Sequence, residues 1–279
     1  MTFLAMSLLI WAASLLAGFL GALTGLGGGV VVVPLLAVLF QVDLRYAVGA
    51  SLLSVIATSS GAAAAYVREG VSNVRVGMFL EIATTVGALA GAAIAAHVAT
   101  GAVAVVFGLV LLGAAGVSLR HPARARGSVA SPERIARALR LDGSFPGPDG
   151  PVYYTVRRVP AGFGLMFLAG GLSGLLGIGS GALKVIAMDD VMRLPFKVST
   201  TTSNFMIGVT AAASAGVYLA RGYIDPGLAA PVVLGVLAGA LLGARLLPRI
   251  RSHVLRLVFA AVIVALAVEM LYQGSTGRL

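Results

Sequence analysis

Long apolar runs follow one another along the chain and predict membrane-spanning helices. Most are close to the roughly 20 residues that an α-helix needs to cross the hydrocarbon core of a bilayer, whereas a transmembrane β-barrel would show short segments of alternating polarity. The pattern therefore predicts an all-α, polytopic integral membrane protein. The runs are 3–40, 46–66, 76–97 and 101–119 before a polar stretch, and 161–192, 199–220, 228–247 and 254–272 after it.

A glycine cluster divides the first run, which is too long for a single span. Its members are Gly25, Gly27, Gly28 and Gly29. Glycine is costly inside a helix, so the helix should break there. The apolar piece that follows, 30–40, would cover roughly half of the bilayer core at about 1.5 Å per residue. We therefore expect a helical hairpin whose second arm does not fully cross, although a hairpin with two crossing arms would fit the distribution of charges equally well.

The second half of the chain repeats the first. A shift of 152 residues places the first glycine cluster on a second cluster, and Ser51 on Ser203. A shift of 148 residues aligns the segment 87–91 with 235–239, both of which begin and end in glycine. The second cluster comprises Gly177, Gly179 and Gly181. The sequence thus predicts a duplication.

The duplication divides the chain into three parts. Two membrane repeats, 1–119 and 161–279, each contain a glycine-broken hairpin and three crossing helices, and a polar linker, 120–160, joins them. The linker is rich in arginine, proline and glycine. Within it we expect a short amphipathic helix at 132–140 and a loop at 142–151.

The positive charges orient the two repeats. The chain has 20 Lys and Arg residues against 10 Asp and Glu, a net charge of +10, and in a membrane protein this excess indicates basic cytoplasmic loops rather than a nucleic-acid partner. Three crossings per repeat invert the second repeat relative to the first. With the linker in the cytoplasm, most basic residues then lie on that side. We therefore expect a multi-pass protein of a bacterial-type inner cell membrane, embedded in its lipid bilayer, with a cytoplasmic central loop.

The composition excludes several classes of function. Hydrophobic residues make up 59% of the chain and charged residues 11%, which is too apolar for a water-soluble enzyme. The chain has no cysteine, and its three histidines lack metal-ligand spacing, so we expect no metal, no cofactor and no catalytic constellation. A channel and a membrane assembly protein without transport activity stay open as alternatives to a transporter.

Broken helices in inverted repeats are typical of the substrate sites of secondary transporters. Hairpins entering from opposite faces would bring the two glycine clusters together, and their backbone N–H groups and positive helix ends would suit an anion. The alternative is that the glycines only allow close helix packing. The candidate substrate-binding residues are Gly25, Gly27, Gly28, Gly29, Ser51, Gly177, Gly179, Ser180, Gly181, Lys184, Thr201, Thr202, Ser203 and Asn204.

Two polar features distinguish the second repeat. Lys184, three residues after Gly181, offers a positive charge to an anionic head group; alternatively it reaches the cytoplasmic interface or pairs with Asp189 or Asp190. The run 199–204 opens a helix with hydroxyl and amide groups that can donate hydrogen bonds to anion oxygens. Helix capping and interhelical hydrogen bonding are the alternative for this run.

Three further residues receive structural interpretations. Glu81 lies near the cytoplasmic end of its helix, where we expect it to face the interface rather than carry a proton. Tyr218 fits an aromatic belt. Arg45 either attracts anions or anchors a helix end. Coupling to protons or sodium ions and assembly into a homodimer are both left open by the sequence.

The glycine segments resemble a known family signature. The stretches Gly18–Pro34 (GFLGALTGLGGGVVVVP) and Gly170–Gly181 (GGLSGLLGIGSG) are similar to the paired signature of the TauE/SafE family of membrane transporters. The resemblance implies transport of small anions, most directly export of sulfite or organosulfonates such as sulfoacetate, by alternating access; another small anion or sulfur compound is the alternative. The second motif departs from the first, with Ser180 where glycine is common and Lys184 in the place of Val32.

Overall fold

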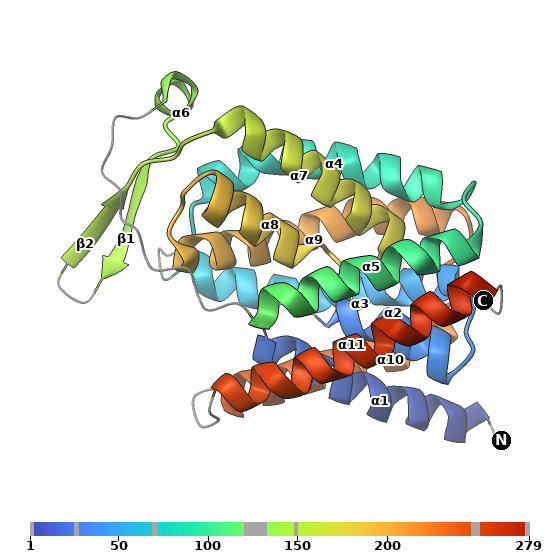
Figure 1. Cartoon of the computed structure of the whole chain (residues 1–279). Helices are drawn as coiled ribbons and strands as arrows, with labels where there is room; N and C mark the ends of the chain where they lie inside the picture. Colours follow the sequence, from blue (N-terminus) through green and yellow to red (C-terminus); the bar gives the residue numbers. More distant parts are fainter. Residues whose placement is uncertain are drawn as a thin grey trace.

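Helices make up most of the chain and follow the apolar runs (Figure 1). The structure is a computed structural model that describes residues 3–24, 28–68, 72–119, 133–147, 150–246 and 252–276. Before the linker it contains α1 (Phe3–Thr24), α2 (Gly29–Pro34), the π-helical turn η1 (Leu35–Leu39), α3 (Leu44–Arg68), α4 (Val74–Ala95) and α5 (Thr100–Leu119). After the linker come α7 (Val159–Leu176), α8 (Gly181–Ile186), the π-helical turn η2 (Ala187–Val191), α9 (Phe196–Ala220), α10 (Pro226–Leu246) and α11 (Ser252–Thr276).

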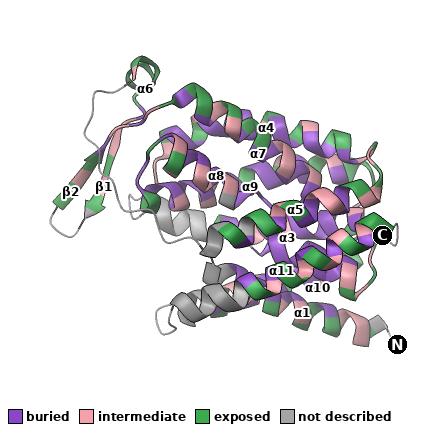
Figure 2. Ribbon diagram, in the orientation of Figure 1, coloured by how far each residue is buried: buried purple, intermediate pink, exposed green. Residues whose placement is uncertain are grey.

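The outward faces of these helices are apolar. Among the described residues, five helices are long and apolar enough to cross a membrane, namely α1, α4, α7, α9 and α10. Buried residues lie between the helices, and exposed ones line the outer surface (Figure 2). Leu8, Ile82 and Leu168 are each more than half exposed, a pattern that suits lipid rather than water. The protein is an all-α polytopic membrane protein, as predicted.

Helices from the two halves of the chain pack in pairs. The most extensive contacts join α1 to α10, α4 to α7, α5 to α11 and α3 to α9. In the order of the chain, α1, α3, α4 and α5 of the first half correspond to α7, α9, α10 and α11 of the second. The pair of α1 with α10 therefore corresponds to the pair of α7 with α4, and each of the other two pairs joins corresponding helices. An internal two-fold relation between two repeats would produce this pattern. It puts α3 and α9, which carry Ser51 and Ser203 at corresponding positions, against each other at the centre.

Glycine contacts determine the offset between the halves. Gly87 of α4 packs on the carbonyl oxygen of Phe167 in α7, and Gly239 of α10 packs on that of Leu15 in α1. Gly239 lies 152 residues after Gly87, and Phe167 lies 152 residues after Leu15. The prediction of a 148-residue offset in this helix is therefore wrong by about one helical turn. The sequence alignment was misled because Gly and Ala recur every four residues here, as close helix packing requires.

Each half contains a helix, a break and a short returning arm. The returning arms, α2 with η1 and α8 with η2, are 11 residues each, which is about 16 Å and roughly half of the bilayer core. The π-helical turns η1 and η2 also correspond at an offset of 152. Because Pro34 precedes η1 whereas Ile186 precedes η2, the proline is not what creates the turn.

The linker differs from the prediction. Its helix α6 (Arg134–Ala138) is shorter than expected, and most of the predicted loop at 142–151 belongs to an antiparallel hairpin of β1 (Gly143–Gly147) and β2 (Gly150–Tyr154). Apolar contacts on one face of the ribbon hold it, with Phe145 and Tyr154 ring centres 6.4 Å apart. These contacts join residues of different strands, which local composition does not reveal. The proline- and glycine-rich composition of the segment therefore predicted a loop.

Asn73 joins the linker to the membrane helices. Its side chain caps α4 by accepting from the Val76 N–H, and its amide nitrogen donates to the Tyr154 hydroxyl at 2.8 Å and the Leu141 carbonyl at 2.9 Å. Its backbone N–H donates to the hydroxyl of Thr202 in α9 at 3.0 Å. Burial raises the pKa of the Tyr154 phenol, which therefore stays neutral in its role as acceptor. The linker is thus fastened to the N-terminus of α4 and, through Asn73, to the second turn of α9.

Candidate functional site

The two helix breaks meet at Ser51. The Ser51 hydroxyl donates to the carbonyl oxygen of Gly177 at 2.8 Å and lies 3.4 Å from that of Gly29. A Cβ atom at Gly29 would come within 3.1 Å of the same Gly177 oxygen and 2.7 Å of Val55. One residue of α3 therefore holds the start of α2 against the second break, so three of the candidate residues, Gly29, Ser51 and Gly177, lie together.

Ser203 occupies the equivalent place in the second half. Its hydroxyl donates to the Gly181 carbonyl at 3.2 Å, across the same 22 residues that separate Gly29 from Ser51. Gly179 packs on Ile207 of α9 and Val55 of α3. The second break thus lies between the two central helices, each of which supplies one serine hydroxyl to it.

The second break has a left-handed backbone. The φ angles are 69° at Gly177, 70° at Gly179 and 47° at Ser180, values that glycine adopts at little cost and serine does not. The Ser180 hydroxyl is buried, and no described residue hydrogen-bonds to it. A strained residue with an unsatisfied buried hydroxyl is a feature that often marks a functional site.

Some predicted site residues lie elsewhere. Gly28 packs on Val236 of α10, and Gly25 and Gly27 fall outside the described residues. The Thr201 hydroxyl donates to the Lys197 carbonyl of its own helix at 2.9 Å, and Thr202 accepts from Asn73 at the linker. Asn204 is half-buried. Of the polar run in α9, Ser203 is therefore the member whose described hydrogen bond reaches a break.

Lys184 is fully buried in α8, one turn beyond the second break. It neither reaches the interface nor contacts Asp189 or Asp190, and its ammonium group instead donates to the hydroxyl of Thr210 in α9 at 2.5 Å. Side chains in an α-helix lean toward its N-terminus, so Lys184 leans back toward the break at which α8 begins. The interfacial interpretation of Lys184 is thus wrong, and the lysine belongs to the surroundings of the breaks.

Glu81 is a functional candidate for which the sequence interpretation favoured the wrong alternative. It is only 7% exposed, and its carboxylate oxygen Oε1 accepts from Thr210 at 2.6 Å and from Thr85 at 3.1 Å. The expectation that it faces the interface is wrong, because the side of α4 that carries Gly77 and Glu81 is buried in the helix bundle. Glu81 lies four residues after Gly77 and so on the same face of the helix, and a glycine on that face indicates close helix packing. This spacing was the sequence signal that Glu81 is buried.

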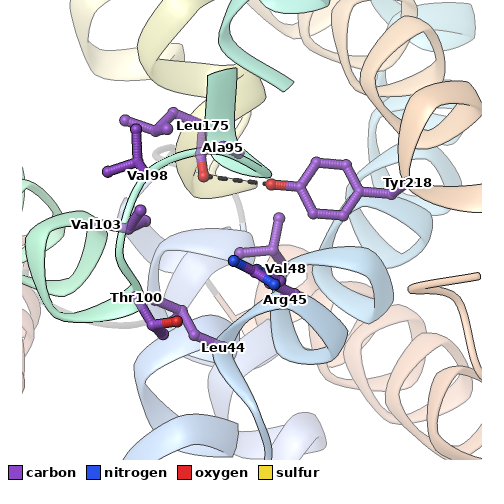
Figure 3. A pocket seen from close by; sticks show the side chains of 9 residues that line it. All are labelled: Leu44, Arg45, Val48, Ala95, Val98, Thr100, Val103, Leu175 and Tyr218. Carbon is purple, nitrogen blue, oxygen red and sulfur yellow. Dashed lines mark hydrogen bonds between the residues drawn. The ribbon is translucent and has the colours of Figure 1, made fainter. Parts of the chain in front are cut away.

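A cavity lies between the start of α3 and the ends of α4, α7 and α9, and Figure 3 shows its lining residues. It is a small hollow, on which the Arg45 and Tyr218 side chains converge from α3 and α9. A second hollow, which shares Arg45 and Tyr218, adds Arg221 and Tyr223 to the lining. Tyr218 is 3% exposed and donates to the Leu175 carbonyl at 3.4 Å, so its assignment to an aromatic belt is wrong.

The floor of this cavity adjoins the second break. Val48 lines the cavity, and a Cβ atom at Gly177 would lie 2.7 Å from Val48 Cγ1. Arg45 stands above, with its guanidinium 5.6 Å from the Tyr223 ring centre and one N–H 3.3 Å from the Tyr223 hydroxyl. A positively charged hollow therefore lies beside the second break, and such a charge attracts small anions.

Comparison with known proteins shows the family of the chain. The model of a protein family described as "Sulfite exporter TauE/SafE" matches residues 10–270. A protein of Bacillus subtilis (strain 168), named "Probable membrane transporter protein YunE", is 28% identical over 267 residues, which cover 93% of this chain and 95% of that protein. No solved structure matches the chain.

Proposed function

Since the chain belongs to the sulfite exporter TauE/SafE family and is a membrane transporter rather than an enzyme, we propose that it exports sulfite or organosulfonates such as sulfoacetate by alternating access. The observation that carries this proposal is the meeting of the two breaks at Ser51, with Lys184 one turn away. A site of this kind offers hydroxyl and backbone donors beside a single positive charge.

These donors match the chemistry of a sulfur oxyanion. Each sulfonate or sulfite oxygen accepts hydrogen bonds, and the Ser51 and Ser203 hydroxyls now donate only to backbone carbonyls, from which an anion can withdraw them. The buried hydroxyl of Ser180 adds a third donor. Neutral donors with one cation bind an anion firmly enough to select it and weakly enough to release it.

The helix pairing supports the transport mechanism that we propose. Corresponding contacts at an offset of 152 residues support two inverted repeats, 1–119 and 161–279. Rocking of the hairpins against α3 and α9 would then expose the breaks to one side of the membrane at a time. We further propose that the linker lies in the cytoplasm of a bacterial-type inner membrane and that the cavity around Arg45 faces the outer side, as the substrate exit.

Ligand-dependent thermal stabilisation of the purified protein tests the substrate class. We expect sulfoacetate or sulfite to raise the melting temperature in a saturable manner, by the equivalent of about 2.7 kcal/mol at 100 times Kd, whereas acetate does not. The Ser51→Ala/Ser203→Ala variant should bind at least tenfold more weakly, because hydrogen bonds to a charged group contribute about 1.5–3 kcal/mol each.

Ser54→Ala is the matched control for this variant. Ser54 is also buried in α3, but its hydroxyl donates to the carbonyl of Ser51 within the same helix, so its removal should leave sulfoacetate binding unchanged. Equal stabilisation by acetate would indicate another anion as the substrate. Stabilisation by none of these anions, or full stabilisation of the double variant, would contradict the proposal.

Removing the charge of Arg45 should weaken capture from the outer side. Arg45→Gln is expected to raise the KM for sulfoacetate by roughly threefold to tenfold at low ionic strength and by less at high salt, because Arg45 acts by long-range attraction. Transport into proteoliposomes at two salt concentrations measures this effect. Arg137→Gln, on the exposed surface of the linker, should leave KM unchanged, and an unaltered KM in Arg45→Gln would remove Arg45 from the pathway.

A further inference from the structure

A buried polar chain links three helices beside the second break. Lys184 of α8 donates to Thr210 of α9 at 2.5 Å, and the Thr210 hydroxyl lies 2.6 Å from Oε1 of Glu81 in α4. Lys184 and Thr210 are both 0% exposed, and Glu81 is 7% exposed. The ammonium and carboxylate are therefore at most about 5 Å apart, a distance at which opposite charges in a poorly polar interior attract strongly.

The arrangement satisfies Glu81 only in part. The second carboxylate oxygen, Oε2, is buried, and no described residue hydrogen-bonds to it. A buried carboxylate is stable only with a counter-charge and a complete set of donors. Glu81 therefore depends on Lys184, acting through Thr210, for its stability as an anion.

Most other charged residues on the helices around Glu81 and Lys184 lie at the ends of these helices. Helix α4 packs on α7 and α9, and α8 packs on α7, α9 and η2. Lys184 is the charged residue that the described contacts bring to Glu81. The remaining charged residues on or next to these elements are Arg75 in the first turn of α4, Arg157 and Arg158 before α7, Lys197 and Arg221 at the two ends of α9, and Asp189, Asp190 and Arg193 in and after η2.

Lys184 also faces a competing demand. It leans toward the break where α8 begins, and Thr210 lies one turn from Ile207, on which Gly179 of that break packs. An anion held at the breaks would attract the same ammonium group. One ammonium group cannot fully neutralise both the anion and the Glu81 carboxylate. Binding of an anion therefore weakens the electrostatic stabilisation of ionised Glu81 by Lys184.

We propose that Glu81 is a proton-binding site that couples proton movement to anion movement, an inference that rests on the proposed function. When an anion enters, the Lys184 ammonium turns from Thr210 to the anion, and Glu81 takes a proton from water on the open side. An O–H bond forms on the carboxylate, and the donor water species loses that proton. When the anion leaves, Lys184 returns and Glu81 releases the proton, so anion and proton cross together.

Simultaneous measurement of sulfoacetate and proton fluxes in proteoliposomes tests this inference. Sulfoacetate is a suitable probe because it stays fully ionised near neutral pH, and a trapped pH-sensitive dye reports protons. For the wild-type protein we expect one proton to cross with each sulfoacetate, in the same direction. Sulfoacetate flux without proton movement would overturn the inference on the wild-type protein alone.

Two variants identify the carrier. In Glu81→Gln and Thr210→Val, the proton flux that accompanies sulfoacetate should fall to the background measured in vesicles without protein. Thr210→Val tests this without changing the charge of the protein. Glu269→Gln is the matched control. Like Glu81, Glu269 is a helical glutamate that accepts a hydrogen bond from a side chain, here the amide of Gln273, and its replacement should leave the wild-type ratio unchanged. An unchanged ratio in Glu81→Gln would overturn the assignment.

The outcomes separate the two proposals. If wild-type protein exchanges labelled for unlabelled sulfoacetate across the membrane but moves no protons, the proposed function stands and the coupling inference fails. If wild-type protein shows no exchange of sulfoacetate or sulfite, the substrate assignment fails, and the inference that rests on it fails too. If Glu81→Gln does not fold, as judged by gel filtration, Thr210→Val and the wild-type measurement decide.

Discussion

Replacing Lys184 by methionine is expected to reduce sulfoacetate transport by about 100-fold and to destabilise the protein by about 3–5 kcal/mol. Methionine fills a similar volume without the charge. It leaves Glu81 buried without its counter-charge, and it removes the buried positive charge beside the breaks. Transport into proteoliposomes and thermal unfolding in detergent measure the two effects separately.

A double variant separates the two roles of Lys184. Lys184→Met/Glu81→Gln removes both charges, so it should recover most of the lost stability, because a neutral pair in place of a buried ion pair is often tolerated. Transport should stay low, because the anion still lacks its cation. Lys197→Met, at an exposed position of the second repeat, should change neither quantity. Wild-type transport by Lys184→Met would exclude this residue from the site.

Adding one methyl group at Gly177 is expected to abolish transport. Gly177 ends α7 with a φ of 69°, and its Cβ atom in the Gly177→Ala variant would lie 2.7 Å from Val48 Cγ1. The strained backbone costs about 1–3 kcal/mol and the overlap a similar amount. Val48 belongs to α3, which carries Ser51, so relief of the overlap separates the elements that form the candidate site. Sulfoacetate counterflow and thermal unfolding measure the loss.

Gly222→Ala is the control for backbone strain alone. Gly222 follows α9 with a φ of 75°, and no atom lies within 4 Å of the position that a Cβ would take. We expect a similar cost for the left-handed conformation but transport close to that of the wild-type protein. Equal loss of transport in both variants would mean that backbone strain, rather than the contact between break and α3, governs activity.

The membrane architecture could be predicted well because its cause is local. Apolar runs near 20 residues form helices wherever they occur in a bilayer, and α3 and α9 begin and end within a few residues of the predicted runs. The two glycine clusters could be identified as breaks because glycine destabilises a helix at its own position. The pairing of Ser51 with Ser203 followed from the duplication alone.

Features that depend on tertiary contacts could not be predicted in the same way. The direction in which Glu81 points depends on the packing of α4 against α7 and α9, which hydropathy does not encode. Tyr218 was assigned to the membrane surface because its type is common there, whereas the structure buries it beside α7. The hairpin of β1 and β2 depends on pairing between strands, and neither strand has enough apolar residues to indicate it alone.

Counterflow of radiolabelled sulfoacetate into proteoliposomes tests the central claim most directly. Vesicles that contain the wild-type protein and an excess of unlabelled sulfoacetate should accumulate the label transiently, sulfite should compete with it, and acetate should not. The Ser51→Ala/Ser203→Ala variant should accumulate little, whereas Ser54→Ala should behave as the wild-type protein does. Absence of counterflow with the wild-type protein, or equal counterflow in the double variant, would contradict sulfur-oxyanion transport through the meeting point of the two helix breaks.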